Sequence, residues 1–156
     1  MINIIPAGTC DYVQVELLLS EYAASLENGS SSQNLGLEPA AEYAPPSGCV
    51  LVAKEELDVV GCVALRHISD DACEMMRLYV RPSFRERGIG RTLSESLIGE
   101  ARARGYRVMR LGVLYSMREA LRLYESLGFR KIAPYRLNAG KGTLFMQLDI
   151  TTSFFP

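Results

Sequence analysis

A strand-like segment, Glu74-Met75-Met76-Arg77-Leu78-Tyr79-Val80, leads through Arg81-Pro82-Ser83-Phe84 into the turn Arg85-Glu86-Arg87-Gly88-Ile89-Gly90. An R-x-x-G-x-G turn that leaves a strand and opens a helix directs several backbone N–H groups toward one small volume. Its two glycines let the backbone approach a ligand without an intervening Cβ, and the helix start adds free donors and a partial positive charge. The segment therefore predicts a binding site for phosphate oxygens.

Other phosphate-binding patterns fit this turn less well. The dinucleotide pattern G-x-G-x-x-G fails because Leu93 stands where the third glycine belongs, and the G-x-x-x-x-G-K-[ST] pattern of nucleoside triphosphatases is absent from the sequence. An ordinary strand-to-helix connection remains the alternative, since glycine is common in such turns. The position of the turn between a strand and an amphipathic helix favours phosphate binding.

The composition is that of an ordinary globular protein, with 156 residues, 48% of them hydrophobic and 22% charged. This length predicts one domain over residues 1–156. No apolar run is as long as a membrane span, and Met1-Ile2-Asn3 lacks the basic start of a signal peptide. We therefore expect a cytoplasmic protein without membrane contact.

Charge is distributed unevenly along the chain, although the formal net charge is only −1. Acidic residues dominate up to Met76, whereas basic residues dominate from Arg77 to Arg110. Because the basic segment contains the phosphate-type turn, it favours a phosphorylated small molecule over nucleic acid as a partner. The acidic part would suit a cationic substrate, or it could simply form solvated helix faces.

Side chains suited to metal binding are few. Cys10, Cys49, Cys62 and Cys73 are widely spaced, and His67 is the only histidine. A zinc site would need several closely spaced ligands, so we expect no metal. We interpret the cysteines as small buried side chains.

Apolar spacing predicts a sheet with helices packed against it. Short polar connections between strands at 49–54, at 59–68 and after Asp71 predict an antiparallel meander. A helix from Ile89, closed by Gly105, precedes a strand at 108–113, which predicts one parallel crossover. The other expected elements are strands at 2–5, 129–133 and 143–150, a first helix ended by Asn28-Gly29, a short helix at 39–43, and a helix opened by the capping box Ser116-Met117-Arg118-Glu119 and ended by Gly128.

A second motif lies downstream, Ala120-Leu121-Arg122-Leu123-Tyr124-Glu125-Ser126-Leu127-Gly128-Phe129. With Arg85–Gly90 it resembles the GNAT superfamily of acyl-CoA-dependent N-acetyltransferases, which carry a coenzyme A pyrophosphate loop and then an A-x-x-x-Y-x-x-x-G-F helix. Two motifs in this order are more specific than either alone. The resemblance implies a mixed α/β fold, with a mainly antiparallel sheet of about seven strands, splayed between the fourth and fifth strands and flanked by about four helices.

The resemblance also implies where acetyl-CoA binds. Backbone N–H groups of the turn and helix start would hold the pyrophosphate, and the preceding strand would pair with the pantetheine arm as with an added strand. The chain departs from the family pattern at Met117, where many members have an asparagine that contacts the arm. The expected coenzyme-binding residues are Leu78, Tyr79, Val80, Arg85, Glu86, Arg87, Gly88, Ile89, Gly90, Arg91, Ala120 and Tyr124.

Two side chains are candidates for catalysis. Tyr124 matches the family tyrosine that can donate a proton to the leaving thiolate, although it also lies on an apolar helix face and could serve packing. Glu74 precedes Arg85 at the separation where some members carry a glutamate that accepts the amine's proton, directly or through water. The opposing interpretation is that Glu74 ends a solvated hairpin beside Asp70 and Asp71.

The function implied is transfer of an acetyl group from acetyl-CoA to the primary amine of a small molecule or amino acid. The amine would attack directly in a ternary complex, without a metal. The alternative is an acyl-CoA-binding sensor or scaffold without turnover. Many members of the superfamily form dimers, so the resemblance leaves a homodimer open.

Overall fold

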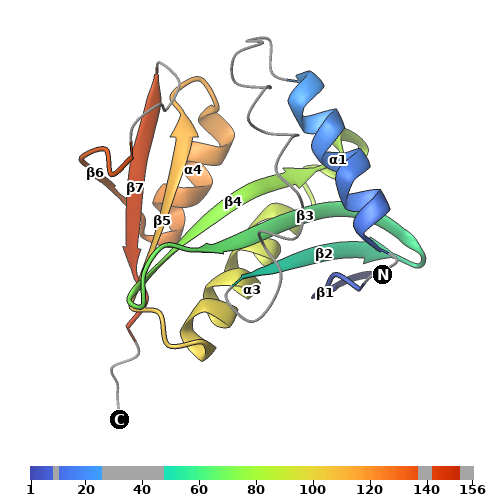
Figure 1. Ribbon diagram of the computed structural model, residues 1–156. Helices are drawn as coiled ribbons and strands as arrows, with labels where there is room; N and C mark the ends of the chain where they lie inside the picture. Colours follow the sequence, from blue (N-terminus) through green and yellow to red (C-terminus); the bar gives the residue numbers. More distant parts are fainter. Residues whose placement is uncertain (9–10, 26–47, 137–141, 152–156) are drawn as a thin grey trace.

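The computed structural model describes residues 1–8, 11–25, 48–136 and 142–151. These residues form a sheet of seven strands in the order β1-β2-β3-β4-β5-β7-β6 (Figure 1). The strands are β1 (Ile2–Pro6), β2 (Cys49–Glu55), β3 (Asp58–His67), β4 (Ala72–Val80), β5 (Val108–Leu114), β6 (Arg130–Ile132) and β7 (Thr143–Asp149).

Neighbouring strands of this sheet are antiparallel with one exception. β4 and β5 are parallel, and the chain crosses between them through helix α3 (Ile89–Ala103). This topology confirms the predicted mixed α/β fold class, including the parallel crossover after the phosphate-type turn.

Helices pack on both faces of the sheet. α3 and α4 (Arg118–Leu127) share one hydrophobic cluster, and α1 (Tyr12–Ser25) packs on the opposite face (Figure 1). A short 3-10 helix, η3 (Pro82–Phe84), precedes the turn. The described part of the chain therefore holds three α-helices where about four were expected, and the short helix predicted at 39–43 lies outside it.

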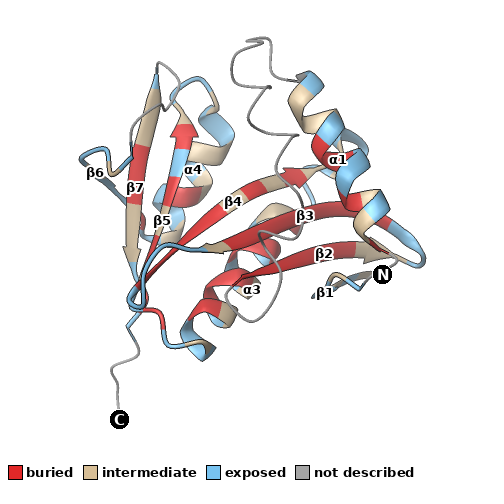
Figure 2. Ribbon diagram, viewed as in Figure 1, coloured by how far each residue is buried: buried red, intermediate tan, exposed pale blue. Residues whose placement is uncertain are grey.

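The larger core lies between α3, α4 and the sheet. The predicted stripe of α3 is buried here, and its members Ile89, Leu93, Leu97 and Ala101 are each at most 4% exposed. β2, β3 and the start of β4 carry long runs of buried residues because helices cover both of their faces (Figure 2). Gly105, with φ 90°, follows α3 as its predicted stop.

The start of α4 differs from its prediction. The capping box was wrong, because Met117 rather than Ser116 is the N-cap residue and no side chain caps the helix. The Ser116 carbonyl instead accepts the N–H of Arg118 at 3.0 Å, so Ser116 belongs to the turn that enters the helix.

Three of the four cysteines are described, and their surroundings fit the structural interpretation. Cys49, Cys62 and Cys73 are buried and free. Burial raises the pKa of the Cys62 and Cys73 thiols to about 12, so neither is a nucleophile at neutral pH. None of the helices in the described ranges is long and apolar enough to cross a membrane.

Candidate active site

β4 and β5 are paired only at their beginnings. Their register ends where Glu74 lies opposite Arg110, although β4 continues to Val80 and β5 to Leu114. Figure 1 shows the two strands diverging beyond this point. The edge of β4 that faces β5 after Glu74 therefore has no partner strand among the described residues.

A β-bulge lies on this unpaired part of β4. The register with β3 shifts between Cys62 and Ala64, so that Arg77 and Leu78 together oppose one β3 residue. Arg77 has φ 60°, in the left-handed region that costs a non-glycine residue roughly 1–2 kcal/mol. A bulge bends its strand and increases the local twist, which turns β4 away from β5.

The backbone at the end of β4 offers polar groups to this open edge. The N–H of Arg81 donates to Val60 of β3 at 2.9 Å. Since the carbonyl and N–H of one trans peptide point in opposite directions, the Val80 carbonyl points away from β3. Arg85 Nε donates to that carbonyl at 2.9 Å, which shows that a donor can reach the open edge.

The three expected pantetheine contacts alternate between the faces of the sheet. Leu78 and Val80 are half-buried against the cluster that contains α3 and α4. Tyr79 is buried on the α1 face, and its hydroxyl donates to Glu21 at 3.3 Å. Their side chains are thus engaged in packing, so only their backbone N–H and C=O groups are available at the open edge.

The turn at residues 85–90 has the backbone conformation of an anion site. Glu86 and Gly88 have positive φ angles of 64° and 77°, and Gly88 is the N-cap residue of α3. Thr92 is the first residue whose N–H bonds back to the turn, at 3.0 Å from the Gly88 carbonyl. Within the described chain the amides from Arg87 to Arg91 have no acceptor, and they lie at the positive end of the helix dipole.

The two glycines keep this turn open. A Cβ at Gly88 would meet no atom within 4 Å, and one at Gly90 would meet Leu123 only at 3.8 Å. The Arg87 guanidinium lies over the Phe84 ring, 5.0 Å from its centroid. Unpaired amides beside exposed arginines fit the diphosphate of coenzyme A.

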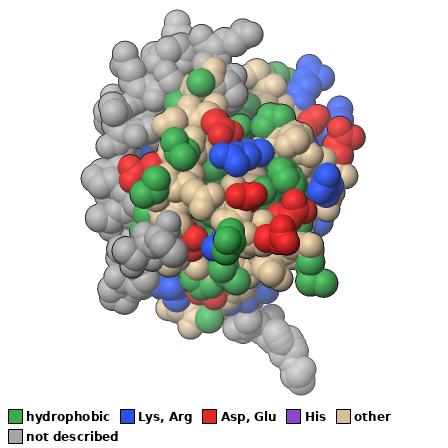
Figure 3. All heavy atoms as spheres, turned by 90° about the vertical axis from the view of Figure 1, so that its right-hand side faces the viewer, with side chains coloured by type: hydrophobic (Ala, Val, Ile, Leu, Met, Phe, Trp, Pro, Cys, Tyr) green, Lys and Arg blue, Asp and Glu red, His purple; other side chains and the backbone are tan. Residues whose placement is uncertain are grey.

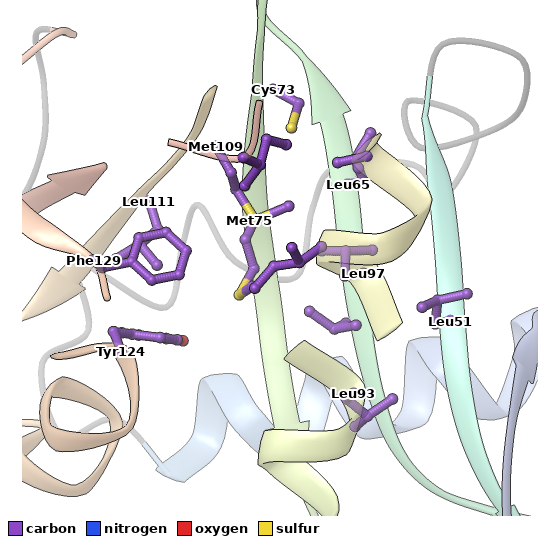
Figure 4. Close-up of a cluster of buried hydrophobic side chains, with 14 of the residues drawn as sticks. Leu51, Leu65, Cys73, Met75, Leu93, Leu97, Met109, Leu111, Tyr124 and Phe129 are labelled. Carbon is purple, nitrogen blue, oxygen red and sulfur yellow. The ribbon is translucent and has the colours of Figure 1, made fainter. Parts of the chain in front are cut away.

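Tyr124 projects from α4 into the core near the parted strands. It is 7% exposed and packs edge-on against Phe129, with ring centroids 5.8 Å apart. Figure 4 shows its hydroxyl pointing toward β4, away from Phe129. Burial raises the pKa of this phenol, so it stays protonated at neutral pH. No hydrogen bond within the described ranges engages the hydroxyl.

A second tyrosine connects the α1 face to the start of α4. The Tyr22 hydroxyl lies 4.0 Å from the Met117 sulfur, and its ring centroid lies 5.5 Å from that of Tyr79. Met117, the departure from the family pattern, therefore contacts α1 across the gap between β4 and β5. No sequence pattern predicted this contact, because residues 22 and 117 share no local pattern.

Glu74 lies in a charged cluster at the root of the gap. It is 1% exposed, and its Oε1 accepts a hydrogen bond from Arg66 at 2.5 Å. Its Oε2 accepts the Tyr135 hydroxyl and lies 3.6 Å from Arg136 Nε. Burial first, and then the charge of Glu74, raise the pKa of Tyr135. The hairpin alternative, in which Glu74 is solvated, is wrong.

The remaining expected residues lie around these groups. Ala120 packs partly buried against the cluster with Tyr124, and Ile89 is buried at the first turn of α3. Arg91 bonds to Ser126 of α4 and to Glu95. The described residues contain no group of His, Cys, Asp and Glu side chains that could hold a metal ion.

The family that these features indicate is also found by comparison with known proteins. The family model for the acetyltransferase (GNAT) family matches residues 15–129. The chain belongs to the GNAT family. It is 34% identical to an uncharacterized N-acetyltransferase of Schizosaccharomyces pombe over 90% of each chain. It is also 39% identical to the N-acetylaspartate synthetase of Rattus norvegicus over 87 residues, which are 55% of this chain and 29% of that protein.

Solved structures of GNAT proteins share the fold. The ribosomal-protein-S18-alanine N-acetyltransferase of Escherichia coli superposes with a TM-score of 0.76 at 23% identity, over 99% of this chain and 97% of its own. YncA of Salmonella typhimurium, solved with its cofactor acetyl-CoA, superposes with a TM-score of 0.74 at 23% identity, over 100% and 98%. At these identities the likeness concerns the fold.

Replacing Gly88 by glutamate should abolish coenzyme A binding. The substitution adds a Cβ at φ 77° and brings a negative charge to the turn amides that are expected to hold the diphosphate. Calorimetric titration with coenzyme A measures the affinity directly.

Gly105→Glu is the matched control. Gly105 also has a positive φ, 90°, with open space around its Cβ position, but it lies beyond the other end of α3. Both variants carry a similar backbone strain of about 1–2 kcal/mol, so only the first should lose the coenzyme. Tight binding by Gly88→Glu would contradict this assignment.

Proposed function

We propose that this GNAT protein transfers the acetyl group of acetyl-CoA to the primary amine of a small molecule or amino acid, while both substrates are bound. The observation that carries the proposal is the unpaired edge of β4, which begins after Glu74 and ends beside the turn at Gly88. A coenzyme whose diphosphate lies on that turn can extend its arm along this edge. The similarity to N-acetylaspartate synthetase also supports an amine acceptor.

The backbone supplies most of the coenzyme contacts in this proposal. The amides from Arg87 to Arg91 hold the diphosphate, with Arg85 and Glu86 shaping the turn. The segment from Leu78 to Val80 pairs with the arm through peptide groups, as an edge strand pairs with an added strand. Ala120 is small and half-buried beside this path.

Acetyl-CoA supplies an activated acyl group and a thiolate leaving group. The chain supplies position and protons: a backbone N–H near Leu78 stabilises the negative charge that develops on the carbonyl oxygen. Tyr124 donates its proton to the departing thiolate, and its raised pKa keeps that proton available.

Glu74 receives the proton of the attacking amine. Both of its oxygens already accept donors, from Arg66 and from Tyr135, and the side chain is 1% exposed. The proton therefore reaches Glu74 through a water or by displacement of one of these donors. This role is separable from a purely structural one, because only a base changes how the rate depends on pH.

The rival function is a sensor that binds acyl-CoA without turnover. Release of free thiol from acetyl-CoA in the presence of pooled amines distinguishes the two, with mass spectrometry of the amines to identify the acetylated product. The enzyme should release thiol only when an amine is present. Tight coenzyme binding without thiol release across broad amine pools would favour the sensor.

Tyr124→Phe should lower kcat by about 10²- to 10⁴-fold, the usual contribution of general acid catalysis, with little change in coenzyme affinity. Tyr106→Phe is the control, because Tyr106 is also buried but its hydroxyl bonds to His67 at 2.8 Å, away from the gap. Stopped-flow thiol release and calorimetry measure the two quantities. An unaltered kcat would remove Tyr124 from the mechanism.

The ratio of wild-type to Tyr124→Phe kcat should stay constant from pH 7 to about pH 9. A free tyrosine ionises near pH 10, and burial raises the pKa of Tyr124 above that value, so the acid remains protonated throughout this range. Parallel pH profiles of the two proteins measure the ratio. A ratio that falls toward 1 within this range would mean that Tyr124 loses its proton below pH 9. Its pKa would then not be raised by burial.

Glu74→Gln should lower kcat/KM at neutral pH. The kcat/KM of this variant should rise toward that of the wild type as the pH approaches the pKa of the amine, because a neutral amine needs no base. Wild-type protein should show a weaker pH dependence over the same range. The measurement is kcat/KM for one amine between pH 6.5 and 9.5 with thermal unfolding as a stability check. If kcat/KM depended on pH in the same way in both proteins, Glu74 would act only by positioning other groups.

A further inference from the structure

A row of directly opposed side chains crosses the sheet where β4 and β5 separate. Arg66, Glu74, Arg110 and Gln147 stand opposite one another on β3, β4, β5 and β7. Opposed residues share a face of the sheet. Arg110 lies between Met109 and Leu111, which are buried in the cluster of the other face, so the row lies on the α1 face.

The guanidinium of Arg136 joins this row from the loop after β6. A Cβ at Gly112 would lie 3.2 Å from Arg136 Nη2, so the glycine makes room for the guanidinium against β5. Gly112 is exposed although it lies within a central strand, and Arg136 is 40% exposed. Gly112 is two residues beyond Arg110, about 7 Å along the strand, and thus past the last pairing between β4 and β5.

Aromatic rings fix the two arginines that border the gap. The Arg110 guanidinium lies over Tyr135 at 5.6 Å from the ring centroid, and the Arg136 guanidinium lies over Phe145 at 5.7 Å. Arg110 Nε also donates to Gln147 Oε1 at 2.8 Å. Such contacts hold a guanidinium in place and leave its outer N–H groups for an anion.

Among the described side chains of this cluster, positive charges outnumber negative ones. Arg66, Arg110 and Arg136 surround one described carboxylate, Glu74, which pairs with Arg66 at 2.5 Å and with Arg136 Nε only loosely at 3.6 Å. In the described part of the chain, Arg110 has no carboxylate within ion-pair distance. The excess charge favours an anionic group at this position.

Among the described acidic side chains of the first half of the chain, only Glu74 forms an ion pair with Arg110 or Arg136. Figure 3 shows acidic side chains interspersed with basic and hydrophobic ones on the side of the molecule that it presents. Two described acidic residues of this half pair with other basic side chains, Asp11 with Lys54 at 3.0 Å and Glu21 with Arg81 at 3.1 Å. The cationic substrate that the sequence suggested therefore has no support in this cluster.

We propose that the acceptor is an amine that carries a carboxylate, an amino acid, whose carboxylate binds to Arg136 and Arg110. This inference rests on the proposed acetyl transfer and names its substrate class. The opposed charges of the cluster match such a molecule, because its amino group lies on the side of Glu74, reached through a water or a displaced donor, while its carboxylate faces the guanidinium groups. The arrangement selects against amines whose only charge is positive.

The first test compares three amine pools with acetyl-CoA and wild-type protein. The first pool contains amino acids, the second contains the same amino acids with every carboxylate converted to an amide, and the third contains polyamines and peptides with amidated C-termini. Thiol release and product mass should show transfer to the first pool and little to the second. Equal transfer to the first two pools, or transfer only to polyamines or to peptides with amidated C-termini, would overturn the carboxylate site but leave acetyl transfer intact. No transfer to any pool would overturn both.

The second test assigns the residues. Arg136→Gln and Arg110→Gln should each raise KM for the acetylated amino acid by roughly 10- to 100-fold, the usual cost of a lost charge-assisted hydrogen bond. KM for its amide should not change, and Arg136→Lys should recover only part of the loss, since a single ammonium replaces a bidentate fork. Arg107→Gln removes the same charge from an exposed position just before β5 and should leave both KM values unaltered. A KM rise of equal size for acid and amide would show a structural effect and contradict the contact.

Discussion

The site is built on backbone groups of β4 that no described strand pairs. Peptide groups inside a sheet normally pair with both neighbours, yet the pairing of β4 with β5 ends at Glu74, and no other described strand takes the place of β5. The bulge at Arg77 bends β4 away from β5. Arg77 adopts a positive φ at this bulge, a strained conformation for a residue other than glycine. The edge leads to a turn whose amides have no acceptor among the described residues, so donors and acceptors of both segments are left for a ligand.

The rest of the molecule holds this line of backbone in position. α3 buries its apolar stripe against the sheet and thereby fixes the turn at its N-terminus. α4, which follows β5, places Tyr124 near the gap between β4 and β5. On the opposite face, Glu74 and the arginines around it lie where an acceptor would approach. In the proposed reaction, coenzyme contacts would therefore come mainly from the backbone, and acceptor contacts would come from side chains.

Sequence reasoning succeeded where one local pattern determines the outcome. Glycine spacing before an amphipathic helix located the turn, and the apolar stripe from Ile89 located α3. It failed at Ser116, where backbone bonding overrode a good capping pattern. It missed the cluster around Glu74, because Arg66, Arg110 and Arg136 are brought together only by register and by a loop contact at Gly112. The alternation of Arg110 with the buried Met109 and Leu111 was the one sequence signal that could have placed Arg110 on the opposite face of the sheet.

We expect the separated ends of β4 and β5 to hold acetyl-CoA with its diphosphate on the turn at Gly88. A crystal structure of the protein with coenzyme A would test this expectation. The diphosphate should lie within hydrogen-bond distance of the amides from Arg87 to Arg91, with the pantetheine arm along β4 beside Leu78. A diphosphate bound elsewhere, with no ligand paired to the β4 edge, would rule out this mode of binding.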